Sequence, residues 1–174
     1  MTTKEDVEAI IAAELKASKI KNPVELLTKS SFNLYEWKRF YSNNDTQVAM
    51  EWLWNNIDLE DYSIWKVDYK YNNELTQTFM SSNLIGGFYQ SLDKYRKYIF
   101  GNMVVLGENN NNIITGYFIL RGKNLSLFTD QDDIESWLFT NVNDIKSKTQ
   151  EIGDVFEWKE IINGKSCTSG KTFK

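Results

Sequence analysis

The chain has 174 residues, a formal net charge of −4, no histidine and one cysteine. The missing histidine excludes Ser–His or Cys–His nucleophiles, imidazole proton transfer and nearly all mononuclear zinc sites. The negative charge is only a weak argument against a dedicated nucleic-acid surface, and the alternative is a local basic patch of Lys66, Lys70, Lys94, Arg96 and Lys97. The single Cys167 excludes intrachain disulfides and fits a reducing compartment, so we expect a cytoplasmic protein without cofactor or metal.

Residues 2–19 are predicted to form a lead-in helix, because Thr2 and Glu5 match a capping box and an apolar stripe follows. This helix either docks on the domain or a partner, or frays, since isolated helices of this length are marginal. Pro23 marks the boundary between a lead-in helix and linker at 1–22 and a domain at 23–174. With no run of about twenty apolar residues, no transmembrane helix and no membrane partner are expected.

Two short helices with many aromatic residues come next. Asn33 and Glu36 form a capping pair for a helix that ends near Ser42. Asp45 or Thr46 caps a second helix that reaches residue 57.

The segment that follows has the period of a half-buried strand. From residue 63 to 71, apolar and aromatic residues alternate with polar ones. Asn72 and Asn73 predict a turn, and the Thr and Phe content of residues 75–80 predicts a second strand.

The period changes to that of a helix after Gly86 and Gly87. Apolar residues are then spaced three, four, three and four apart: Ile85, Phe88, Leu92, Tyr95 and Ile99. We predict a structural bend at the glycine pair, which we favour over an anion cradle because no Lys-Ser or Lys-Thr follows it. Leu92 is expected on the buried face of this helix.

The remaining chain is predicted to add a β-meander and a last helix. Residues 103–107 and 113–120 flank a run of four asparagines and predict a hairpin, and residues 125–128 predict a third strand of the meander. Residues 134–142 fit either a strand or a helix, and a helix is expected from Asn143 onward. The polar tail is expected to be pinned to the domain by Phe173.

These elements together predict an α+β fold, with an antiparallel β-sheet of about five strands packed with several α-helices in a single compact domain. The acidic run Asp130, Asp132 and Asp133 lacks the spacing of a calcium loop, so a solvated loop is favoured over a metal site.

Five residues are candidates for partner binding, because Trp, Tyr and Arg are enriched at interface hot spots: Trp65, Asp68, Tyr69, Tyr71 and Arg96. The alternative is that Asp68 faces solvent between two lysines and that Arg96 lies on a solvated helix face, beside a surface ion pair of Asp93 with Lys97. No catalytic residue is assigned. A contrasting hypothesis is a small enzyme or ligand-binding domain with an aromatic pocket around Trp65, Asp68 and Tyr69.

Four stretches of sequence carry a resemblance to a known family: YEWKRFYSNNDT at 35–46, DYSIWKVDYKYNNELTQTFMSSNLIGGFYQSLDKYRKYIFG at 61–101, ITGYFILRG at 114–122 and SGKTFK at 169–174. With them, the chain resembles the C-terminal domain of the gamma subunit of translation elongation factor 1, from about residue 23 to residue 174. The wording departs from the family at residues 134–142 and in the tail before Gly170.

The resemblance implies a non-catalytic interaction or scaffold module in translation elongation. In the family, the gamma subunit belongs to the complex that recharges elongation factor 1-alpha with GTP, and its transferase-like N-terminal domain holds the nucleotide-exchange subunit. The chain has nothing that resembles that N-terminal domain. The implied partners are therefore elongation factor complex subunits, contacted indirectly, and RNA or other proteins.

Overall fold

The computed structural model describes residues 31–123, 125, 128 and 134–174. The predicted lead-in helix and linker at 1–22 and the acidic run at 130–133 lie outside the described residues. The helical elements are α2 (Leu34–Asn43), α3 (Thr46–Asn56), η2 (Asn72–Glu74), α4 (Thr78–Leu92), η3 (Asp93–Tyr98), η4 (Ile134–Ser136) and α6 (Ile145–Glu157). The strands are β1 (Tyr62–Tyr69), β2 (Ile99–Glu108), β3 (Asn111–Arg121), β4 (Trp137–Asn141), β5 (Ile161–Ile162) and β6 (Lys165–Phe173).

The strands form one antiparallel sheet in the order β4-β1-β3-β2-β6-β5. Its centre is the β2–β3 hairpin, which turns at Asn109 and Asn110. Asn110 has φ 66°, a left-handed conformation that asparagine adopts more readily than most residues. The predicted α+β class with an antiparallel sheet is confirmed, as is the hairpin.

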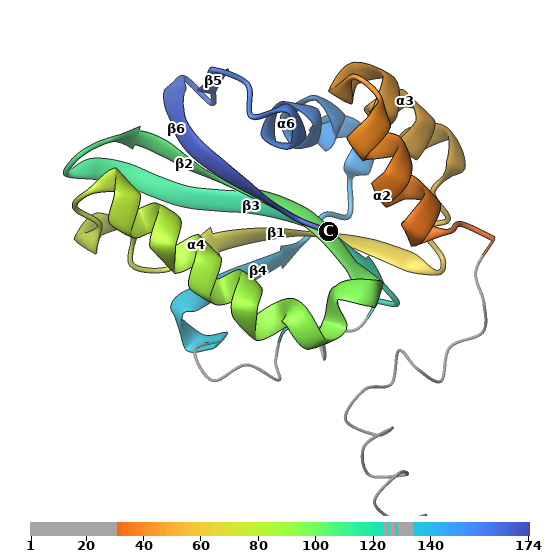
Figure 1. Cartoon of the computed structure of the whole chain (residues 1–174), viewed down its shortest axis with the longest axis horizontal. Coiled ribbons are helices and arrows are strands. Elements are labelled where there is room, and N and C mark those ends of the chain that lie inside the picture. The colour runs from red at the N-terminus through yellow and green to blue at the C-terminus, as the bar shows by residue number, and fades with distance from the viewer. Residues whose placement is uncertain (1–30, 124, 126–127, 129–133) are drawn as a thin grey trace, which may run out of the picture.

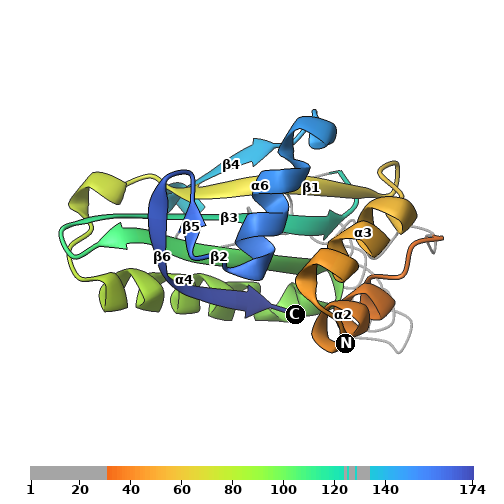
Figure 2. The same cartoon turned by 90° about the horizontal axis from the view of Figure 1, so that it is seen from above.

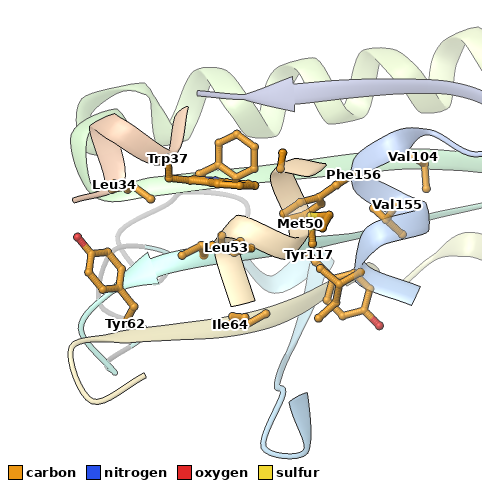
Figure 3. Packing of buried hydrophobic residues seen from close by; sticks show 14 of the residues in the cluster. Leu34, Trp37, Met50, Leu53, Tyr62, Ile64, Val104, Tyr117, Val155 and Phe156 are labelled. Atoms are coloured by element: carbon orange, nitrogen blue, oxygen red, sulfur yellow. The ribbon is translucent and has the colours of Figure 1, made fainter. Parts of the chain in front are cut away.

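Helices cover both faces of the sheet. Figures 1 and 2 show α2, α3 and α6 on one face and α4 on the other. Because successive strand residues point to opposite faces, each face has its own apolar cluster. Trp65 and Val67 of β1 pack with Ile85, Phe88 and Leu92 of α4. On the opposite face, buried side chains of α2, α3 and α6 meet the sheet, as Figure 3 shows for Trp37, Leu53, Ile64, Tyr117 and Phe156.

The helices on the α6 side begin close to where the sequence predicts them. The Asn33 side chain caps α2 and accepts hydrogen bonds from the backbone N–H groups of Tyr35 at 2.9 Å and Glu36 at 3.3 Å. Asp45 precedes α3 without a side-chain capping bond. The last helix, α6, has Asp144 at its N-cap position, one residue after the predicted Asn143.

Three predictions around α4 are wrong. Residues 75–80 do not form a strand, because α4 already begins at Thr78. Gly86 and Gly87 lie inside α4 and make no bend. The helix ends at Leu92, and after the 3₁₀ segment η3, Ile99 begins β2 instead of completing the helix. Leu92 itself is fully buried, as predicted.

The sheet also differs from prediction at its edges. Of residues 125–128, the two that are described, Leu125 and Phe128, lie outside any strand; the Phe128 N–H donates to the Leu125 carbonyl at 2.8 Å. The segment 134–142, whose sequence fits either a strand or a helix, provides η4 and the edge strand β4. The polar tail forms β6 beside β2, and Phe173 is buried against α4 and β2, as expected of a pin.

A buried amide links the sheet to the helices above it. Asn102 of β2 is fully buried, and its side-chain oxygen accepts hydrogen bonds from the Trp158 indole at 3.0 Å and from the Thr172 hydroxyl. Its amide nitrogen donates to the Tyr41 hydroxyl at 3.4 Å. The Trp158 ring lies directly over Gly170, where a Cβ atom would approach it to 2.8 Å. Asn102 thus ties α2, the end of α6 and β6 together.

Within the described part of the chain, no helix is both long and apolar enough to cross a membrane.

Candidate interaction surfaces

The aromatic candidates on β1 lie on the face of the sheet that α4 covers. Trp65 is 8% exposed, and its indole N–H donates to the Ser63 hydroxyl at 2.8 Å, so this ring is a core residue. Tyr69 is half-buried, with its ring 5.0 Å from that of Trp137 and 5.7 Å from that of Tyr71. Of the three aromatic candidates, only Tyr69 and Tyr71, which follows β1, are substantially accessible to solvent, and their rings are neighbours.

Asp68 lies on the opposite face of β1. It pairs with Thr115 of β3 and Leu138 of β4, and its negative charge acts on the Tyr117 hydroxyl of the α6-side cluster. The structure therefore does not bring Asp68 together with Trp65 and Tyr69. An enzymatic or ligand pocket built from these three residues is not supported.

A groove opens beside Tyr69, between α4 and the segment that leads into it. Its volume is about 510 Å³. The lining residues are Tyr69, Glu74, Leu75, Thr76, Met80, Ser81, Asn83, Leu84 and Gly87. Tyr71 is 42% exposed and contacts Tyr69 at the same end, so two predicted partner residues adjoin this groove. We call it the α4 groove.

The outer face of α4 is uncharged and carries three exposed apolar side chains. None of its fifteen residues is charged, in contrast to α2, α3 and α6. Phe79 is 64% exposed and Met80 50%, and Leu84 is also exposed. A surface helix normally turns charged or polar side chains to water, so this face of α4 departs from the common pattern.

Side chains of the β2–β3 hairpin hold the N-terminal half of α4 in place. Asn109 accepts hydrogen bonds from the Thr78 N–H at 3.0 Å and from the Thr78 hydroxyl at 3.3 Å, and so acts as the helix cap. Gln77, at the N-cap position, makes no such bond. Asn112 accepts from the buried Ser81 hydroxyl at 2.6 Å and donates to the Thr76 carbonyl at 3.0 Å. One wall of the α4 groove is therefore anchored to the central strands.

Arg96, the fifth candidate, lies at the other end of α4 in η3. Its guanidinium pairs with Asp93, lies 4.9 Å from the centre of the Phe173 ring and donates to the Lys174 carbonyl at 2.6 Å. The predicted pair of Asp93 with Lys97 is replaced by this pair, because a 3₁₀ helix brings residues three apart together. Arg96 therefore fixes the end of β6 and is separate from the tyrosines.

Lys38 of α2, which the sequence did not single out, lies next to Arg96. Its amine donates to the Arg96 carbonyl at 2.6 Å. Burial, and secondarily the positive charge of Arg96, lowers the pKa of Lys38 to about 8. The folded protein thus releases this proton more readily than the unfolded chain does.

We expect Lys38 to titrate near pH 8, which can be measured from the pH dependence of its acylation followed by mass spectrometry. Because the pKa is lower in the folded state, the contribution of Lys38 to stability should rise as pH increases from about 8 toward the unfolded value. Arg96→Gln should move the midpoint to higher pH, since a neighbouring positive charge is removed. A midpoint unchanged by this substitution would contradict the charge effect.

The sequence prediction missed Phe79, Met80 and Leu84 as surface residues, because it placed residues 75–80 in a strand and began the helix only at Ile85. A signal for them was present. Met80, Leu84 and Gly87 follow the four- and three-residue spacing of one helical face, in a segment without any charge.

The fold and these surfaces define a class: an α+β domain with an exposed apolar groove beside its sheet. Comparison with known sequences then gives the family. A family profile described as "Elongation factor 1 gamma, conserved domain" matches residues 19–124. The chain belongs to this elongation factor 1 gamma family.

Full-length relatives agree with the profile. The chain is 46% identical to elongation factor 1-gamma 2 of Saccharomyces cerevisiae over 165 residues, covering 91% of the chain and 40% of the relative. It is 42% identical to elongation factor 1-gamma of Schizosaccharomyces pombe, covering 88% and 39%, and 39% identical to that of Homo sapiens, covering 98% and 40%. The chain thus spans about 40% of the length of these relatives.

Proposed function

We propose that the chain is a non-catalytic interaction module of the translation elongation factor 1 machinery. The observation that carries the proposal is its identity of 39 to 46% to proteins named elongation factor 1-gamma, over most of its own length. The resemblance at 61–101 runs through β1 and α4, the elements that border the α4 groove.

The proposal includes a cytoplasmic location and contact with subunits of the elongation factor 1 complex, either direct or through other components. RNA and other proteins are further partner classes within it. Support for an interaction role comes from the α4 groove, since exposed apolar surface beside polar residues is typical of protein-binding sites.

Capture from a translation-competent yeast extract tests this function. The tagged 174-residue chain should enrich elongation factor 1 subunits or ribosome-associated proteins over a tagged, unrelated protein of similar charge. Parallel capture after nuclease treatment separates protein partners from those bridged by RNA. If neither sample contains an elongation or ribosome-associated component above the control, the proposed function is wrong.

A further inference from the structure

We propose that the α4 groove is the docking site for a single amphipathic helix of a partner protein, which lies antiparallel to α4 and carries acidic residues in its first turn. This inference deepens the proposed function, on which it rests, because it gives the chemistry of the partner.

The first argument is the character of the exposed face. The solvent-exposed positions of α4 are Phe79, Met80, Asn83, Leu84, Gly87 and Gln90. Their spacing of one, three and four residues is that of a continuous helical stripe, and none of them is charged. In helix-in-groove recognition, an amphipathic helix lays its apolar face against a hydrophobic groove. Phe79, Met80 and Leu84 give the stripe the apolar contacts for such a helix.

The second argument comes from Gly87. Glycine inside a helix is less favourable than alanine, so a chain keeps it at a cost in stability. Packing against the described part of the chain gives no reason for it, because a Cβ atom at Gly87 would have no described neighbour within 4 Å. Yet Gly87 lines the α4 groove together with Leu84. A missing side chain at this position lets a second helix approach the backbone of α4 closely.

The third argument is the size of the stripe. A helix of fifteen residues, as α4 has, is about 22 Å long. At a helix diameter of about 10 to 12 Å, a stripe of this length covers an area of roughly 220 to 260 Å². This area is well below the roughly 800 Å² per partner of a typical interface between folded proteins. The stripe therefore fits one helix better than a second copy of the domain.

The charges at the two ends of the stripe set the direction of the partner. Glu74 is exposed at the N-terminal end of the α4 groove. At the other end, η3 carries Lys94, Arg96 and Lys97 against the single acidic Asp93. Lys94 and Lys97 are exposed and share one side of the 3₁₀ helix. A partner helix with acidic residues in its first turn therefore complements the basic end when it runs antiparallel to α4.

Two synthetic peptides of about eighteen residues test the proposal on the full chain. Both carry leucines along one helical face and an alanine opposite Gly87; one has glutamates in its first turn and lysines in its last, and the other has these charges exchanged. Fluorescence anisotropy of the labelled peptides should show saturable binding of the first and at least about tenfold weaker binding of the second, a difference of about 1.4 kcal/mol.

A matched pair of glycine variants separates binding from stability. Gly87→Ala should raise the Tm by a few degrees, because it removes a helix-interior glycine without a clash. It should also weaken the first peptide by at least about fivefold, since the added methyl group prevents close approach. Gly153→Ala in α6, where a Cβ atom would lie an ordinary 3.8 Å from Met50, should also raise the Tm but leave peptide affinity unchanged.

The outcomes are distinct. Absence of binding by either peptide at about 100 μM, equal affinity for both charge arrangements, or unchanged affinity of Gly87→Ala would each overturn the proposal. So would concentration-dependent dimerisation in sedimentation experiments that Gly87→Ala abolishes, because a second copy would then occupy the groove. If the first peptide binds as expected but the capture from yeast extract contains no elongation or ribosome-associated component, the α4 groove remains a helix-binding site and the proposed translation function is wrong.

Discussion

Phe88→Ala should destabilise the domain by about 3 to 5 kcal/mol, the usual cost of removing a fully buried phenylalanine. Phe88 of α4 is completely buried. Its ring stacks on that of Trp137 with centroids 4.7 Å apart and meets the edge of the Phe118 ring at 5.9 Å. The substitution therefore opens a cavity at the point where α4 joins both β4 and β3. Urea unfolding of the purified variant measures the loss.

Phe79→Ala is the matched control, because it removes the same side chain from the exposed side of the same helix. We expect its free energy of unfolding to change by less than about 0.5 kcal/mol. If the two variants lost similar stability, the assignment of buried and exposed faces to α4 would be wrong. The same control variant should bind the first helical peptide more weakly, because Phe79 lies on the exposed stripe.

Asn102→Ala is expected to cost about 2 to 4 kcal/mol, because it leaves the Trp158 indole N–H and the Thr172 hydroxyl without their acceptor. Each unsatisfied group costs about 1 to 3 kcal/mol when buried, and both groups are only partly buried, so the upper end of that range does not apply to either. Both groups bond to the Asn102 side-chain oxygen. The loss should appear as a lower midpoint of urea unfolding.

A double-mutant cycle isolates the hydrogen bond from cavity formation. Trp158→Phe retains a ring but removes the N–H that bonds to Asn102. If the bond contributes, the two substitutions together should cost less than the sum of their separate effects, by about 0.5 kcal/mol or more. Additive losses would show that the Trp158 indole gains nothing from Asn102.

The sequence was sufficient to predict those helices and turns whose conformation is determined by residues close to them in the chain. The caps and apolar spacing of α2, α3 and α6 and the asparagine turn of the hairpin are of this kind. The N-terminal half of α4 is different: its cap is Asn109, thirty-one residues away, while the local Thr and Phe content favours a strand. β6 is likewise polar and contains Gly170, and its strand conformation depends on pairing with β2.

The candidate site was only partly predictable from sequence. Because successive side chains of a strand point to opposite faces of the sheet, Asp68 lies on the other face of β1 from Trp65 and Tyr69. A pocket that contains all three side chains is therefore incompatible with the strand prediction itself. Whether an aromatic residue on that strand is buried or exposed depends on what covers it. Trp65 lies in the core, whereas Tyr69 and Tyr71 adjoin the α4 groove.

The central hairpin also has a consequence for how the domain folds. β2 and β3 are joined by two residues, so their pairing needs little loop closure, whereas β1 and β6 reach them from distant parts of the chain. We expect the hairpin to form early and to act as a template for both outer strands. Substitutions in it should then slow folding, while substitutions in β4 should mainly speed unfolding.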